Sequence, residues 1–187
     1  MGLEAWTGLK GNKMVKVLGV VPLSAVKGFR GFEKRCLDLL LVTDAGILVL
    51  RDLCKLKGLE DFLPISLKEL CGLFTGLPEN SKGFREYTYS VIGLNIDLDG
   101  LAETLGTRFS KGCLLIPSGT ITSLGLRRRT IHMVVTKTSL IEVEVKTEEK
   151  SHRFLVLPAS YKDLSEEAAY NEVLDMLRRA KTPVTPL

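Results

Sequence analysis

Two runs of aliphatic residues joined by a short polar turn constrain the fold more than any other feature of the sequence. Residues 37–42 contain five aliphatic side chains and residues 47–50 contain four, with Thr43, Asp44 and Gly46 between them. Asp and Gly between two such runs predict a β-hairpin over residues 36–50. Because both faces of its strands are apolar, we expect other elements to cover the sheet on each side.

The remaining sequence predicts further strands and helices. Strand patterns occur at residues 14–21, 86–98, 113–116, 120–126, 130–136, 139–146 and 152–157. Ser66 and Glu69 form a capping box for a helix over residues 66–75, and Ile65 and Leu70 can form its hydrophobic staple. Asp99 is expected to cap a short helix over residues 100–105.

An amphipathic helix is expected to close the chain over residues 165–180. Ser165 or Asp163 can cap it, and an apolar stripe follows at helical spacing: Ala169, Val173, Leu177 and Ala180. The predicted fold class is therefore α+β. It has a mainly antiparallel sheet or partly open barrel, this C-terminal helix, and a helical insertion around residues 58–106.

Four segments together carry a resemblance to a known superfold. They are residues 39–50 around Thr43 and Asp44, Ile116-Pro117 through Ile121, the strand pairs between residues 130 and 157, and the helix over 165–180. Their order resembles the pleckstrin-homology-like superfold, in particular its prokaryotic and GRAM-type branches. The resemblance implies a binding or scaffold module for lipids, peptides or proteins, and residues 57–110 depart from it as an insertion.

We expect one domain over residues 1–181 and a flexible tail over 182–187. Residues 41–48 and 134–141 share an aliphatic-Val-Thr pattern, which permits a duplication relating residues 14–100 to 111–181. A Val-Thr start is also common in hairpins, so the similarity has a second explanation.

Composition bears on the environment of the protein. The longest apolar stretches are far below the ~20 residues of a membrane helix. The apolar run over residues 17–23 is also short for a signal peptide, so we expect a cytoplasmic protein. The chain has no Gln and four Asn beside abundant Lys, Arg and Glu, a tendency of thermophile proteins.

The four cysteines are Cys36, Cys54, Cys71 and Cys113, and no Cys-x-x-Cys occurs. Because the cysteines have no such spacing and the chain has only two histidines, we expect no metal site. We expect the cysteines to be small buried hydrophobic residues or, if the protein comes from a thermophile, to include a disulfide such as Cys54–Cys71.

The sequence contains no recognised catalytic, nucleotide or cofactor motif. His132 and His152 have no neighbouring carboxylate and nucleophile in sequence, so an enzyme would need residues assembled from distant positions. Asn95, Asp97 and Asp99 match the opening of an EF-hand loop, but Gly106 stands where a bidentate Glu is needed. A strand that runs into a helix cap explains the same residues.

Residues 104–141 contain six basic side chains and no acidic one. Arg127, Arg128 and Arg129 are expected at a turn between two strands, and with Arg108 and Lys111 they form a candidate anion-binding site. The alternative is that these arginines are solvated or paired with Glu142, Glu144, Glu148 and Glu149.

The leading hypothesis is a non-catalytic binding or scaffold module whose partner is another protein or a second copy of the chain. An enzyme with a site assembled from distant residues is the alternative. A weak binder of nucleic acid or of anionic lipid headgroups, through the basic block at 104–141, is the third possibility.

Overall fold

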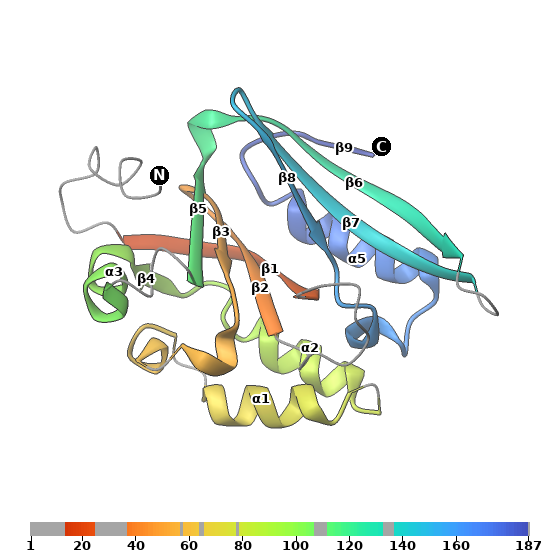
Figure 1. Cartoon of the computed structure of the whole chain (residues 1–187), viewed down its shortest axis with the longest axis horizontal. Helices are drawn as coiled ribbons and strands as arrows, with labels where there is room; N and C mark the ends of the chain where they lie inside the picture. Colours follow the sequence, from red (N-terminus) through yellow and green to blue (C-terminus); the bar gives the residue numbers. More distant parts are fainter. Residues whose placement is uncertain are drawn as a thin grey trace.

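The hairpin over residues 37–50 is the centre of a five-stranded antiparallel sheet (Figure 1). The computed structural model describes residues 14–24, 37–56, 58–63, 66–77, 79–106, 112–132 and 137–186. In it β2 (Leu37–Thr43) and β3 (Gly46–Leu50) pair with each other. Strand β1 (Met14–Ser24) lies beside β2 and β5 (Cys113–Pro117) beside β3, while the short β4 (Asn95–Asp97) pairs with the start of β1.

The turn between β2 and β3 depends on two residues. Thr43 Oγ1 donates a 2.8 Å hydrogen bond to the carbonyl oxygen of Gly46. Gly46 has a φ of 143°, and a Cβ built on it would lie 2.2 Å from the carbonyl oxygen of Ile116 on β5. Glycine is therefore required where the hairpin meets its neighbouring strand.

A second sheet is built from the C-terminal third of the chain. Its order is β8 (Ser151–Leu155), β7 (Lys137–Thr147), β6 (Ile121–His132) and β9 (Val184–Pro186), with β9 parallel to β6. Leu23 at the end of β1 forms a bridge with Val156 just after β8, and the Leu157 amide donates to the Pro22 carbonyl oxygen at 2.9 Å. These contacts join the two sheets, one of which is strongly curled into a half-barrel (Figure 1).

Four α-helices lie in the described part of the chain: α1 (Leu67–Thr75), α2 (Ser81–Tyr89), α3 (Leu98–Leu105) and α5 (Glu166–Leu177). Short 3-10 turns include η1 (Leu53–Lys55), η2 (Leu59–Asp61) and η5 (Pro158–Tyr161). None of these helices is long and apolar enough to cross a membrane.

The central strands are buried on both faces, as their sequence predicts. Alternate residues of β2 and β3 enter two hydrophobic cores. Leu39 and Leu48 face the core that contains α1, α2 and α3, whereas Leu40 and Ile47 face the core formed with β6, β7 and α5. Full burial of each such side chain contributes about 1.5–3 kcal/mol of transfer free energy.

Helix α5 packs closely against β1 of the larger sheet. A Cβ built on Gly19 would lie 2.7 Å from the carbonyl oxygen of Met176. Arg179 also donates a 2.9 Å hydrogen bond to the carbonyl oxygen of Leu18. The small residue in β1 allows this close approach.

The α+β fold class is confirmed, together with the predicted hairpin and the closing helix. Ser66 caps α1 by accepting a hydrogen bond from the Glu69 amide, and Ser165 caps α5 by accepting one from the Ala168 amide. Ile65, the other half of the expected staple, lies outside the described residues. Residues 184–186, in the segment expected to be a flexible tail, form β9.

The prediction of a strand over residues 86–98 is wrong. Residues up to 89 belong to α2, and only Asn95–Asp97 pair as a strand. The buried residues of α2 are Ser81, Phe84, Arg85 and Thr88, at the i, i+3, i+4 and i+7 positions of one helical face. This helical spacing of buried residues determines the structure of residues 81–89, although the residues from Tyr87 onward alternate as in a strand.

Asp97, rather than Asp99, caps α3. Its side chain accepts hydrogen bonds of 3.1 Å from the amides of Asp99 and Gly100. The polar residues that match an EF-hand opening therefore end a strand and begin a helix.

The placement of the three arginines at a turn is also wrong. Strand β6 is continuous from Ile121 to His132 and pairs with β7 as far as Lys137. Arg127, Arg128 and Arg129 consequently lie within the strand, where successive side chains point to opposite faces of the sheet.

Candidate functional site

Arg127 and Arg129 lie on the same face of β6 and bind one buried carboxylate. Glu142 stands directly opposite Arg127 in the register of β6 and β7. Arg127 donates from Nε to Glu142 Oε1 at 2.8 Å and a second time from Nη2, and Arg129 Nη1 lies 3.6 Å from Glu142 Oε2. The Glu142 side chain is only 8% exposed. These two arginines thus compensate a buried charge.

Arg128 points to the opposite face, toward α5. It forms an ion pair with Glu167, and its guanidinium carbon lies 4.6 Å from the centre of the Tyr170 ring. The Tyr170 hydroxyl in turn donates to the carbonyl oxygen of Leu126 at 3.1 Å. The hydrogen bond from Arg128 lowers the pKa of Glu167.

The three arginines of the candidate anion site therefore do not share one face of the sheet. The sheet separates Arg128 from Arg127 and Arg129, and Arg108 and Lys111 lie outside the described residues. Of the three described arginines, Arg128 alone pairs with an exposed partner, because 66% of the Glu167 side chain is exposed. Such surface pairs contribute about 0–1 kcal/mol, so an anion from another molecule can replace Glu167 at little cost.

Arg128 also lines a pocket between β7, the segment after β8, and α5. The pocket has a volume of about 110 Å³. Its walls are mainly apolar: Ile141, Val156, Pro158, Tyr161, Leu164 and Ala169. Arg128, Ser139 and Glu166 supply its polar groups. We call this the β7–α5 pocket; it is smaller than the ~300 Å³ at which pockets for drug-sized molecules begin.

A polar network around the buried Arg85 lies behind the β7–α5 pocket and joins α2 to η5 and α5. Arg85, which is 5% exposed, donates to Asp163 Oδ2 at 2.9 Å, to the Ser160 carbonyl oxygen at 2.6 Å and to Glu172 Oε1 at 3.2 Å. The Tyr89 hydroxyl donates to the same Glu172 oxygen at 2.7 Å. Hydrogen bonding by Arg85 holds the pKa of Asp163 far below its usual range, and burial raises the pKa of Tyr89.

Tyr161 connects this network to the pocket. The Arg85 guanidinium carbon lies 5.4 Å from the centre of the Tyr161 ring, and the Tyr161 hydroxyl is 3.3 Å from that of Tyr89. The same tyrosine forms part of the pocket wall. The network therefore fixes one wall of the β7–α5 pocket in place.

Sequence reasoning misses this network because its members are distant in sequence. Arg85 and Asp163 are 78 residues apart. One local signal exists: on a helix, Arg85 shares its face with Phe84 and Thr88, and a buried arginine requires acidic partners.

His152, the histidine whose side chain the structure describes, packs against a neighbouring aromatic ring and lies outside the candidate pocket. His152 on β8 stacks on Phe154, with ring centres 6.3 Å apart and planes 2° apart. Burial lowers the pKa of His152, with smaller contributions from Lys150 and Arg51. His152 does not line the β7–α5 pocket, and the His132 side chain lies outside the described part of the molecule.

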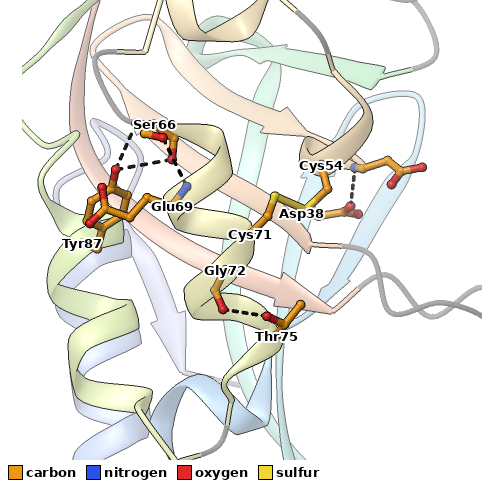
Figure 2. The surroundings of a disulfide bond; sticks show 9 residues. Asp38, Cys54, Ser66, Glu69, Cys71, Gly72, Thr75 and Tyr87 are labelled. Atoms are coloured by element: carbon orange, nitrogen blue, oxygen red, sulfur yellow. Dashed lines mark hydrogen bonds between the residues drawn. A yellow bond between two sulfur atoms is a disulfide. The ribbon is translucent and has the colours of Figure 1, made fainter.

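Cys54 of η1 and Cys71 of α1 form a disulfide (Figure 2). Cys113 on β5 is a free thiol, and burial raises its pKa to about 12. The disulfide is one of the two expectations for the cysteines; the other, that they are small buried hydrophobic residues, is wrong for Cys54, which is exposed. Cys36 lies outside the described residues.

Comparison with protein-family models, with curated proteins and with solved structures found no match. The curled antiparallel sheet and C-terminal helix are compatible with a pleckstrin-homology-like fold.

Proposed function

We propose that this chain is a non-catalytic protein-binding module whose β7–α5 pocket receives one aliphatic side chain of a partner next to a carboxylate. The observation that carries the proposal is the position of Arg128. Its guanidinium lines a pocket with mainly apolar walls, is oriented by the Tyr170 ring and has an exposed partner in Glu167.

The size of the pocket determines what it can receive. A volume of about 110 Å³ suits a single Leu or Ile side chain rather than a cofactor or nucleotide. Burial of such a side chain provides about 1.5–3 kcal/mol. Loss of translational freedom opposes this gain, so the pocket alone supports weak binding, and neighbouring contacts of a protein partner must add to it.

The positive charge of Arg128 favours ligands that carry a carboxylate beside the aliphatic group. Arg128 is always protonated and can bind a carboxylate through two parallel hydrogen bonds. A ligand carboxylate would replace Glu167, which is exposed, while Tyr170 keeps the guanidinium in place. An acidic residue or a C-terminal carboxylate beside the aliphatic side chain meets this requirement.

The other function hypotheses have less support. A pocket that held His152 with carboxylates would favour an enzyme, but His152 stacks on Phe154 outside the β7–α5 pocket. A continuous basic face would favour nucleic acid or anionic lipid, but Arg127 and Arg129 are turned to Glu142. Membership of the pleckstrin-homology-like superfold, which we also propose, agrees with a binding module.

The proposal is tested by titration of the protein with N-acetylleucine, followed by amide NMR shifts. We expect dissociation constants on the order of millimolar, with the largest shifts around Ile141 and Ala169. N-acetylleucinamide, which lacks the carboxylate, and N-acetylalanine, which lacks the isobutyl group, should both bind more weakly. Shifts confined to other parts of the molecule would reject the pocket, and equal binding of acid and amide would reject the role of Arg128.

A further inference from the structure

The Cys54–Cys71 disulfide lies at the surface. Cys54 is exposed and Cys71 is partly exposed, with their Cα atoms 6.1 Å apart. Figure 2 shows the bond between the 3-10 turn that follows β3 and helix α1. Exposed disulfides are the ones that thiols in solution can reach and exchange.

A second pocket borders both sulfur-bearing residues. Its volume is about 320 Å³, and Cys54 and Cys71 line it together with Leu56, Glu60, Leu67 and Lys68. This volume falls in the range of small-molecule sites. A molecule held there lies beside the disulfide.

The pocket also carries charge of both signs. Lys68 precedes Cys71 by three residues on α1, a spacing that places both side chains on one helical face. A lysine ammonium near a sulfur favours the thiolate over the thiol. Glu60 on η2 supplies a negative charge to the same pocket.

We propose that the Cys54–Cys71 disulfide is a thiol-exchange site for a low-molecular-weight thiol that carries both a carboxylate and an ammonium group. The carboxylate would face Lys68 and the ammonium Glu60, which leaves the ligand's sulfur beside the more exposed Cys54. This site is separate from the β7–α5 pocket, so each proposal can fail alone.

The exchange takes place in two balanced steps. The ligand thiolate attacks Cys54 Sγ, a ligand–Cys54 bond forms, and the Cys54–Cys71 bond breaks. Cys71 leaves with the electron pair as a thiolate near Lys68 and takes a proton from water. A second ligand thiolate then attacks the ligand sulfur of the mixed disulfide, which releases Cys54 as a thiolate and leaves two ligand molecules joined by a disulfide.

The surroundings allow this bond to open without loss of the fold. The amide of Asp52 donates to Asp38 Oδ1 at 2.7 Å, which fixes the start of η1 independently of the disulfide. At the other side, the Ser66 amide donates to the Tyr87 hydroxyl at 3.0 Å, and the rings of Phe74 and Phe84 lie 6.3 Å apart. Helix α1 is therefore anchored at both ends by contacts other than the disulfide.

The test uses the oxidised full chain and glutathione as the probe, without denaturant. Samples are quenched with N-ethylmaleimide and mapped by mass spectrometry. We expect a mixed disulfide on Cys54 with N-ethylmaleimide on Cys71, and no glutathione on Cys113. Adducts on Cys71 instead, or a disulfide that reacts only in denaturant, would overturn the proposal.

Lys68 provides the second readout. Replacement Lys68→Gln should slow the initial exchange rate about threefold to tenfold, because it removes the charge that stabilises the leaving thiolate. Lys82→Gln is the matched control, since Lys82 is an exposed lysine on α2 that does not line this pocket. Equal rates in the two variants would contradict the assignment of Lys68.

Discussion

Arg85 and Asp163, 78 residues apart in the chain, are joined by hydrogen bonds to both carboxylate oxygens. Arg85 also lies over the ring of Tyr161, which forms a wall of the β7–α5 pocket. The pair thus links α2, from the middle of the chain, to the C-terminal segment that builds the pocket. The bidentate arrangement of the two charges fixes the orientation of that segment relative to α2.

Replacement Arg85→Met should destabilise the protein by about 1–3 kcal/mol, because Asp163, Glu172 and the Ser160 carbonyl oxygen lose the hydrogen bonds of Arg85 while both carboxylates stay partly exposed. The change is measured as the free energy of unfolding in urea. Lys82→Met is the control, since Lys82 on the same helix is 74% exposed. Equal effects of the two replacements would show that the network does not stabilise the fold.

Stability should fall in acid through Glu144. Hydrogen bonds from Ser151 Oγ and Arg153 Nε lower the pKa of Glu144 from 4.5 to about 2. A carboxyl whose pKa is lowered by folding stabilises the native state above its unfolded pKa, and this stabilisation is lost as pH falls through the folded pKa. The contribution is therefore complete above about pH 4.5 and disappears toward pH 2.

The measurement compares urea unfolding of the wild type and Glu144→Gln between pH 6 and pH 2. The difference between them should shrink as pH falls. Asp163, whose pKa is also lowered, titrates in both proteins and cancels in the comparison. A difference that does not change with pH would contradict this account of Glu144.

The two arginines at Glu142 should differ in their effect on stability. Arg127→Ala should cost about 1–3 kcal/mol, because Glu142 is buried and loses two hydrogen bonds. Arg129→Ala should cost less than about 1 kcal/mol, since Arg129 is 60% exposed and 3.6 Å from the carboxylate. Urea unfolding of both variants provides the comparison, and equal costs would be inconsistent with these geometries.

Local patterns were sufficient to predict the hairpin, the cap of α1 and the cap of α5. Each depends on residues close in sequence, such as Thr43 with Gly46 or Ser66 with Glu69. Residues 86–98 were harder, because Tyr87 and Tyr89 alternate like a strand while Phe84 and Thr88 repeat like a helix. Packing of the helical face into the core decided between the two.

The pocket and the polar network around Arg85 depend on contacts that sequence periodicity does not reveal. Arg128 was a candidate for anion binding, but its neighbours Tyr170 and Glu167 come from a helix about 40 residues later. The run of arginines suggested a turn, whereas cross-strand pairing with Glu142 keeps β6 continuous. The thermophile source, the cytoplasmic location and the duplication stay predictions.

Ala169→Leu should block the β7–α5 pocket while the fold stays intact. Ala169 on α5 is 6% exposed and lines the pocket, so a larger aliphatic side chain there would occupy the ligand's space. Leucine is a good helix former, and cavity filling commonly preserves or raises stability. N-acetylleucine binding should be lost in this variant and kept in Ala168→Leu, whose position on α5 is exposed. Unchanged binding to Ala169→Leu would place the ligand elsewhere.

The central claim is that Arg128 recognises a carboxylate beside an aliphatic group, and the most direct measurement compares Arg128→Gln with Arg129→Gln. Arg128 and Arg129 are adjacent arginines whose side chains lie on opposite faces of β6, and both are exposed. The account predicts that Arg128→Gln weakens N-acetylleucine binding about tenfold and leaves N-acetylleucinamide binding unchanged, while Arg129→Gln changes neither. Equal N-acetylleucine affinities in the two variants would contradict it.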